Sequence, residues 1–453
     1  MIEQITSIIM IVIGSLILIA FGYFGFLSLH EREKRAARIS FLIALLGPIP
    51  LFGLSTLDLT VRLVTVGIII ILIIIFLILF LLPIGRVDHL GEEPARRFDE
   101  RDIIFARFRL SPDSPEFEAY YNMRPENKPV DDLTRSKPGL NSAGSLFWNP
   151  FLSVSVDASF TLTEAMNMAV DGPVAVKRHA LPVDEVTAYI KNLAKYYGAL
   201  DVGITELKPY HVYSHVGRGP GKYGDPIPVE QKYAIAFTVE MDYDMIGPNP
   251  RLQGSMESAR QYVECGRVAV QLAAAIRLMG YPARGHMDGN YRVICPTVAR
   301  DAGLGEIGRM GILMTPRHGP RVRIAVVTTD LELRPDGRCD GKAIIDFCTI
   351  CKKCALTCPS QSIPFEDRQE AEGSIRWKIN ADTCFRYWAI SGTDCGRCMT
   401  VCPYSHPNNP GHNLIRAGIS KSGFFRRIAI WMDDFFYGKK PARREAPKWT
   451  QVS

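Results

Sequence analysis

Residues 348–359 read CTICKKCALTCP, a C-x2-C-x2-C-x3-C-P run formed by Cys348, Cys351, Cys354 and Cys358. A second run, CGRCMTVCP at residues 395–403, repeats the ending with Cys395, Cys398 and Cys402. This spacing is typical of bacterial iron–sulfur proteins, in which the first three thiolates bind one [4Fe-4S] cubane and the fourth reaches the neighbouring cluster. The chain is therefore predicted to carry electrons.

The second run lacks its opening cysteine, and Cys384, eleven positions before Cys395, is expected to replace it. Interleaving the two runs predicts two [4Fe-4S] clusters. The predicted ligand sets are Cys348, Cys351, Cys354 and Cys402 for one cluster, and Cys358, Cys384, Cys395 and Cys398 for the other. Zinc is the alternative, but zinc sites favour paired C-x2-C knuckles. Disulfides fit less well, because a chain of 453 residues buries a sufficient core without them.

Three uncharged stretches open the chain, at residues 5–29, 39–57 and 63–85. A helix needs about 20 apolar residues to cross a bilayer, so the first and third are predicted spans. The middle stretch is interrupted by Gly47, Pro48 and Pro50, which leaves a re-entrant or interfacial segment as its alternative. The first stretch lacks the flanking features of a cleaved signal, so we expect it to stay attached.

Basic residues are distributed unevenly around these spans. Residues 30–38 hold four Lys/Arg, and Arg86, Arg96, Arg97 and Arg101 follow the third span, whereas the loop between the second and third offers only Arg62. By the positive-inside rule, the N-terminus is predicted to lie outside and both basic loops in the cytoplasm. We therefore expect a multi-pass inner-membrane protein whose catalytic domain is cytoplasmic.

Residues 411–453 hold nine Lys/Arg and three Asp/Glu, so this tail accounts for the whole net charge of +6. Interleaved aromatic residues suggest an amphipathic helix on an anionic leaflet, where each cation contributes about 1 kcal/mol. A tail that packs on the body with its charges solvated is the equal alternative. We expect no nucleic-acid partner.

The remaining pattern divides the chain into five regions. They are an anchor at 1–88, a linker and wrapping segment at 89–182, a catalytic domain at 183–340, a ferredoxin-like domain at 341–410 and the basic tail at 411–453. Residues 89–150 show little periodicity. Hydrophobic spacing then predicts helices at 183–198 and 256–279 and strands at 234–241, 291–294 and 323–329. Such alternation indicates an α/β or α+β body with one sheet covered by helices.

Residues 301–311 are rich in glycine, and Gly303, Gly305 and Gly308 form G-x-G-x-x-G. A dinucleotide-binding site requires a strand directly before this motif and a helix after it. Residues 297–302 look helical instead, so only Asp330, about twenty residues further on, favours nicotinamide. More generally, these glycines and Gly311 would let the backbone approach a bulky planar cofactor closely.

The run RDAGLGEIGRMGILMTPRHGPRVRIAVVTTD at residues 300–330, followed by the cysteine region, resembles the reductive dehalogenases and, more distantly, epoxyqueuosine reductase. The resemblance covers residues 183–437. It implies an α/β, nitroreductase-like domain that holds cobalamin, with an appended ferredoxin-like domain for the two clusters. Respiratory members carry a twin-arginine signal and pair with a separate three-helix anchor. Here an anchor-like triple span is fused to the front.

The resemblance also implies a tyrosine proton donor that is helped by a nearby cation. Tyr262 is the favoured candidate and Tyr243 its competitor, because a phenol with a pKa near 10 needs a cation to stabilise its phenolate. Arg323 and Arg309 are the candidate cations, and Asn290 is the candidate for orienting the substrate or the phenolate. Ordinary structural roles remain the alternatives for these residues.

The leading prediction is a membrane-anchored reductive dehalogenase that acts on an organohalide with electrons from a quinol or a ferredoxin-type donor. The first alternative is an epoxyqueuosine-type reductase, which the membrane anchor disfavours. The second is a membrane-bound electron carrier without a substrate of its own. About 250 residues between anchor and clusters argue against a bare carrier, which needs no such body.

Overall fold

The computed structural model describes residues 2–82, 94, 96–371 and 373–452. The chain divides into two compact units. One, here called the membrane unit, comprises Met1–Arg86 with Pro407–Glu445, and the other, the body, comprises Val87–His406 with Ala446–Ser453. Most of the segment predicted as a separate basic tail therefore folds with the predicted anchor.

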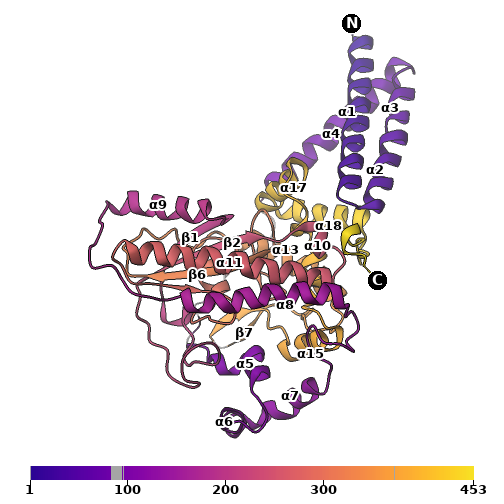
Figure 1. Ribbon diagram of the computed structural model, residues 1–453. Helices are drawn as coiled ribbons and strands as arrows, with labels where there is room; N and C mark the ends of the chain where they lie inside the picture. Colours follow the sequence, from indigo (N-terminus) through magenta and orange to yellow (C-terminus); the bar gives the residue numbers. More distant parts are fainter. Residues whose placement is uncertain (1, 83–93, 95, 372, 453) are drawn as a thin grey trace. The chain divides into compact units, whose positions relative to one another are not determined.

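Three helical segments of the membrane unit are long and apolar enough to cross a membrane: Ile2–His30, Lys34–Leu54 and Leu59–Leu81. The first and third are the helices α1 (Ile2–His30) and α4 (Leu59–Leu81) (Figure 1). The middle segment consists of α2 (Lys34–Leu46) and α3 (Pro48–Leu54), which meet at the interruption expected from Gly47 and Pro48. The end of the third predicted span, at 83–85, and Arg86 lie outside the described residues.

A hydrogen bond and two aromatic contacts inside the membrane unit show which helix ends lie close together. The Arg62 Nη1 atom, near the start of α4, donates a hydrogen bond of 2.8 Å to the carbonyl oxygen of Glu3 at the start of α1. At the opposite ends, Phe80 of α4 and Phe436, a residue beyond the spans, pack against aromatic rings of the same unit. The starts of α1 and α4 therefore lie together at one end of this unit.

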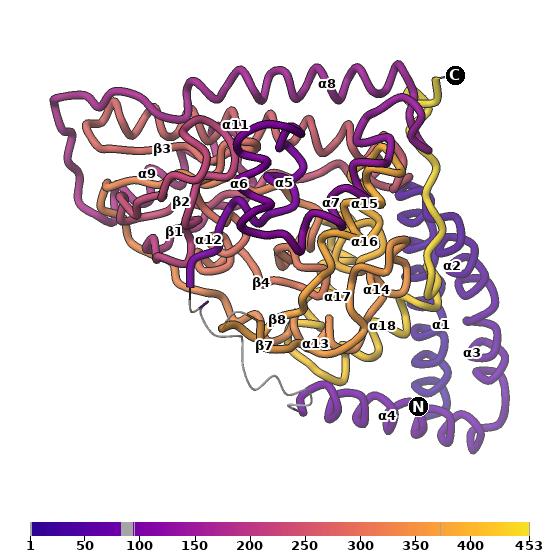
Figure 2. Tube along the Cα trace, turned by 90° about the horizontal axis from the view of Figure 1, so that it is seen from below, coloured from indigo at the N-terminus to yellow at the C-terminus, as the bar shows by residue number. Residues whose placement is uncertain are grey.

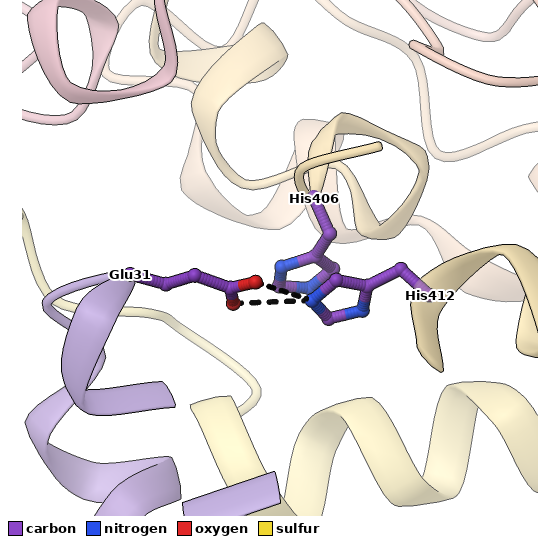
Figure 3. Close-up of side chains that lie close together, drawn as sticks. All are labelled: Glu31, His406 and His412. Atoms are coloured by element: carbon purple, nitrogen blue, oxygen red, sulfur yellow. Dashed lines mark hydrogen bonds and ion pairs between the residues drawn. The ribbon is translucent and has the colours of Figure 1, made fainter. Parts of the chain in front are cut away.

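Two C-terminal helices, α17 (Pro410–Lys421) and α18 (Gly423–Tyr437), complete the membrane unit. The Phe436 ring lies 5.2 Å from the ring of Phe24 on α1. Figure 3 shows the buried Glu31 carboxylate facing His412 of α17, whose Nε2 lies 3.1 Å from both carboxylate oxygens. These contacts hold α17 and α18 to the loop between α1 and α2.

A four-stranded sheet forms the centre of the body, in the order β1-β2-β6-β3. Its strands are β1 (Asp201–Glu206), β2 (Tyr233–Glu240), β3 (Ala283–His286) and β6 (Val322–Thr329). All three pairings are antiparallel, so the body is of the α+β rather than the strict α/β class.

Both faces of this sheet are buried, which explains the nearly unbroken apolar run of β2. Ile235 and Phe237 pack with residues of α9 (Val183–Tyr196) and α11 (Leu252–Leu278) in one hydrophobic cluster. Ala234 and Ala236 point to the other face, where they pack with residues of α12 (Cys295–Asp301). Residues of β2 alternate between the faces, as the period of a strand requires.

The predicted helices at 183–198 and 256–279 correspond to α9 and α11, and the predicted strands at 234–241 and 323–329 to β2 and β6. The strand expected at 291–294 is wrong, because only Val293 makes an isolated bridge, to Val212. The linker expected from the weak periodicity of 89–150 is also more regular than predicted. It contains α5 (Ile104–Arg109), α6 (Pro115–Met123) and α7 (Lys128–Arg135).

The segment predicted to wrap around the body contributes a long helix, α8 (Pro150–Ala165), which runs beside α11 (Figures 1 and 2). The cysteine region follows the sheet. Its elements are α13 (Lys342–Cys351), α14 (Lys353–Thr357), β7 (Gln369–Ala371), β8 (Ser374–Arg376), α15 (Ala381–Ser391) and α16 (Arg397–Thr400). In Figure 2, α15 lies beside α7, so the wrapping segment also packs on the cysteine region.

The glycine-rich run does not have dinucleotide-binding architecture. It follows α12 rather than a strand, and it leads into the two-stranded pair β4 (Glu306–Ile307) and β5 (Leu313–Met314) rather than into a helix. The arrangement that a pyrophosphate requires, a strand followed by a glycine turn and a helix N-terminus, is therefore missing at this motif. The structure therefore does not support nicotinamide binding at this glycine motif.

Candidate active site

The predicted cluster cysteines come together in the body. Burial raises the pKa of the Cys402 thiol well above its usual value, and charge on the nearby Cys348, Cys351 and Cys354 acts in the same direction. Backbone turns make this approach possible, because Lys352 adopts a left-handed conformation, with a φ of 55°, between α13 and α14. The chain can thus present thiols from two short helices to one point.

Cys398 has a second set of thiol neighbours. Burial raises its pKa well above the usual value, and the further contributions come from Cys395, Cys354, Cys384 and Cys358. Cys384 lies on α15, where burial raises the pKa of its thiol and charge on Cys358 acts in the same direction. Because Cys354 is a neighbour of both Cys398 and Cys402, the assignment of each thiol to a cluster stays a proposal.

Arg309 ties the cysteine region to the glycine-rich run. Its fully buried guanidinium donates to the carbonyl oxygens of Cys348 at 2.9 Å, Pro364 at 2.8 Å, Glu366 at 2.7 Å and Thr349 at 3.3 Å. It also lies 4.9 Å from the centre of the Trp377 ring. Arg309 is not among the residues that line the cavity described next. Its geometry is that of a structural cation and not of the catalytic group predicted from the sequence.

A cavity of about 1550 Å³ lies within the body. It exceeds the roughly 300–1,000 Å³ of sites for drug-sized ligands, so it has room for a macrocycle together with a small substrate. Its wall is built by residues of α5, α8, α11 and β6 and by residues 376–394 of the cysteine region. None of the described residues in this wall is a histidine.

Tyr262 and Arg323 meet in the cavity wall. The Arg323 guanidinium, on β6, lies 5.0 Å from the centre of the Tyr262 ring, on α11, and the Phe160 ring of α8 lies 6.2 Å from the same ring. Burial raises the pKa of Tyr262 to about 12, and the Arg323 cation opposes this rise. The structure therefore joins a protonated phenol to the cation that would stabilise its phenolate.

The competing tyrosine Tyr243 and the candidate orienting residue Asn290 lie outside the cavity wall. Tyr243 is not in the cavity wall, and its ring lies 5.7 Å from the Arg321 guanidinium. Asn290 is fully buried, and its Oδ1 accepts a hydrogen bond of 2.7 Å from Arg284. Asn290 does not line the cavity either, so its predicted role in orienting a substrate has no support from its position.

Sequence reasoning missed Asp288, which lies two residues before Asn290 and does line the cavity. Burial raises the pKa of its carboxyl group, and the Arg218, Arg109 and Arg323 cations oppose this rise. A lone Asp in a turn before Gly289 has no recognisable motif in the sequence. Only the folding of that turn towards α11 reveals it.

The glycine-rich run mainly serves close packing of the protein against itself. A Cβ atom at Gly303 would lie 2.6 Å from the carbonyl oxygen of Gly337, and one at Gly305 would lie 2.2 Å from that of Met314. At Gly308 it would lie 2.6 Å from the Met314 side chain. Of the four predicted cofactor-binding glycines, Gly311 lines the cavity.

Comparison with known proteins agrees with this division of the body. A sequence profile described as a 4Fe-4S dicluster domain matches residues 347–406. A tetrachloroethene reductive dehalogenase of Desulfitobacterium hafniense is 35% identical over 196 residues, which are 41% of this chain and 35% of the relative. One of Sulfurospirillum multivorans is 32% identical over 291 residues, 56% of this chain and 58% of the relative. The chain thus spans about a third to three fifths of these relatives.

Solved structures show the same likeness. One catabolic reductive dehalogenase, a K488Q variant, superposes with a TM-score of 0.64 at 25% identity, over 79% of this chain and 49% of its own. Another structure, described as suggesting a mechanism for B12-dependent dehalogenation, has a TM-score of 0.58 at 28% identity, over 65% and 45%. An epoxyqueuosine reductase of Listeria monocytogenes is a more distant sequence relative, 26% identical over 33% of this chain and 43% of its own length. By sequence and by fold, this chain is similar to the reductive dehalogenases, and its residues 347–406 match a 4Fe-4S dicluster domain.

Proposed function

We propose that the protein is a membrane-anchored reductive dehalogenase that replaces a halogen of an organohalide with hydrogen. The reaction consumes two electrons and one proton, and it releases halide. The observation that carries this proposal is the meeting of Tyr262 and Arg323 in the wall of a large cavity that the dicluster domain also lines. The proton donor and the domain that would carry the electrons then line the same substrate space.

Cobalamin is the cofactor that we propose for this cavity, in a body of nitroreductase-like type. The volume of about 1550 Å³ fits a broad planar ring, and Gly311, which carries no side chain, lies in the cavity wall. When bound, the corrinoid would supply the low-valent cobalt chemistry that cleaves the carbon–halogen bond. The homologue whose structure is described as B12-dependent supports this assignment.

Tyr262 is proposed as the group that gives its proton to the substrate carbon. With a pKa of about 12, its phenol stays protonated throughout the neutral range. Arg323 would then stabilise the phenolate that remains, because a nearby opposite charge favours the ionised form. Phe160 and the apolar part of the wall would exclude water, which strengthens this electrostatic interaction.

Electrons are proposed to arrive through two [4Fe-4S] clusters held by the two predicted sets of cysteines. Each cluster is a one-electron carrier, so two in series can deliver the pair of electrons that the reaction needs. Cys402 has three cysteine neighbours and Cys398 has four, with Cys354 in both sets, which gives enough thiols for two such clusters. A quinol or a ferredoxin-type protein is the proposed electron donor.

The membrane unit is proposed to sit in the inner membrane with the body in the cytoplasm. Supporting this orientation, residues 30–38, between the first and second spans, hold four Lys/Arg, whereas the loop between the second and third spans offers only Arg62. On α18, Arg427, Trp431 and Phe435 are exposed along one face. An interfacial helix with its aromatic residues at headgroup level fits this face.

The test is to purify the protein without oxygen from cells supplied with corrinoid, and to measure metal content and halide release. We expect about one cobalt and about eight irons per chain, as one corrinoid and two cubanes require. We also expect halide release from a panel of chlorinated and brominated alkenes and phenols with reduced methyl viologen. Iron without cobalt and without halide release would favour the electron carrier. Turnover of epoxyqueuosine in tRNA would favour the other enzyme.

A further inference from the structure

One carboxylate of the cysteine region reaches into the pair formed by Tyr262 and Arg323. Asp394 Oδ2 accepts a hydrogen bond of 3.1 Å from the Arg323 Nη2 atom. The same oxygen accepts from the hydroxyl of Ser258, which also accepts a hydrogen bond from Arg323. Arg323 and Asp394 each have 17% of their side chain exposed, so the ion pair is shielded from bulk water.

Asp394 is itself held firmly in place. Its Oδ1 accepts a hydrogen bond of 3.1 Å from the Ser255 hydroxyl, and its backbone N–H donates to the same hydroxyl oxygen at 3.1 Å. Ser255 and Ser258 lie one turn apart on α11, two turns and one turn, respectively, before Tyr262 on the same helix. The carboxylate thus links β6, α11 and the segment that leads into Cys395.

These contacts determine which side of the Arg323 guanidinium remains available. The Nη2 atom is occupied by Asp394 and Ser258, whereas the buried Nε atom has no hydrogen-bond partner among the residues that the structure describes. An arginine side chain has several rotatable bonds, and holding it in one buried conformation costs conformational entropy. A fixed carboxylate is what holds the guanidinium over the Tyr262 ring.

We propose that Asp394 is a positioning residue that holds Arg323 against Tyr262, so that the dicluster domain itself completes the proton-donating site. The inference rests on the proposed dehalogenase function. It explains why residues of the dicluster domain have to be docked on α11 for proton donation, and it makes the two parts of the body a single catalytic assembly.

A positioning role and a purely electrostatic role of Asp394 predict opposite effects of Asp394→Asn on the rate of proton donation. The negative charge of Asp394 by itself raises the pKa of Tyr262, whereas Arg323 lowers it. If only the charge mattered, Asp394→Asn would help the phenolate to form and proton donation would become faster. If positioning matters, the variant frees Arg323 and proton donation becomes slower.

The experiment compares wild type with Asp394→Asn, Asp394→Glu and Ser258→Ala in the corrinoid-loaded full chain, with halide release as the assay. We expect Asp394→Asn to lower kcat by about 10-fold to 100-fold, which is less than the full contribution of a general acid, with KM changed by less than about 2-fold. The solvent deuterium isotope effect on kcat should rise, because proton transfer then limits the rate. Asp394→Glu should recover part of kcat. Asp132→Asn, at an exposed ion pair of α7, is the matched control and should behave as wild type.

A double variant excludes a merely structural effect. In a Tyr262→Phe background, Asp394→Asn should cause no further loss of kcat, because both changes act on the same proton transfer. Iron content and cluster spectra are measured in parallel, since Asp394 adjoins Cys395. If Asp394→Asn loses iron, Ser258→Ala tests the same link from α11 and should lower kcat by about 3-fold to 10-fold with full iron.

An unchanged kcat in iron-replete Asp394→Asn and Ser258→Ala would overturn the inference, and so would additive losses in the double variant. A wild-type protein that releases no halide would instead overturn the proposed function. In that case, a crystal structure of Asp394→Asn decides the inference independently. Arg323 should leave the Tyr262 ring in that variant, and an unmoved guanidinium would refute the positioning role.

Discussion

Replacing Arg309 by methionine removes a buried cation on which the backbone of the cysteine region depends. The guanidinium donates four hydrogen bonds to carbonyl oxygens, two at the start of the first cysteine run and two just after its end. At about 1 kcal/mol net for each bond, their loss amounts to about 4 kcal/mol. The interaction with Trp377 adds about 1 kcal/mol, and burial of the methionine returns about 1–2 kcal/mol. We therefore expect a loss of about 3–4 kcal/mol in the stability of this region.

The assay follows cluster absorbance during denaturation in guanidinium chloride, together with iron per chain and turnover per iron. Arg309→Met should lose its clusters at a lower denaturant concentration than wild type, while turnover per retained cluster pair stays close to the wild-type value. Arg334→Met is the control, because Arg334 forms an exposed ion pair with Asp184 and its loss should change stability by less than about 0.5 kcal/mol. A variant with full iron and normal stability but without turnover would refute the structural role and restore the catalytic one.

The remaining predictions concern the proton donor, the clusters and the membrane. Tyr262→Phe should lower halide release at least about 100-fold with cluster spectra unchanged, and Tyr243→Phe should not; the reverse result would move the donor to Tyr243. The raised pKa of Tyr262, about 12, means that its contribution to stability is complete below about pH 10 and is lost as pH rises towards 12. Wild type should therefore lose more stability than Tyr262→Phe between pH 10 and 12 in denaturation curves, and parallel curves would contradict this. Cys384→Ser should remove about half of the iron, whereas Cys339→Ser should remove none; full iron in the first variant would exclude Cys384 as a ligand. A reporter fused after residue 86 should be active in the cytoplasm, and activity of a periplasm-specific reporter would reverse the proposed orientation.

The local sequence pattern predicted the structure correctly wherever one physical requirement dominates a short segment. The membrane-crossing helices were predicted from composition because a bilayer demands an unbroken apolar helix, and α2 and α3 meet at Gly47 and Pro48 as the sequence suggested. The helix α11 and the strands β2 and β6 followed from periodicity. Periodicity failed at residues 89–150, whose short helices are stabilised by tertiary packing and not by a strong pattern of their own.

The candidate site was only partly predictable, because its side chains come from segments far apart in the chain. Tyr262 and Arg323 were selected by resemblance, and the structure brings them together. Nothing in the sequence indicated that the Arg309 guanidinium would donate its hydrogen bonds to backbone carbonyl oxygens. Nor did it indicate that Asp288 would replace Asn290 in the cavity wall. The pattern of apolar residues in a sequence indicates whether a side chain is buried. It does not indicate which cavity that side chain faces.

By itself, then, the amino-acid sequence determined the cysteine spacing and the apolar spans, because a metal cluster and a bilayer each act on neighbouring residues. Tertiary structure alone decided which cation faces the phenol and which carboxylate holds that cation. The contact between Asp394 and Arg323 joins residues 71 positions apart, and it exists only because the cysteine region docks on α11 beside β6. Long-range packing brings such groups together, and no local periodicity records it.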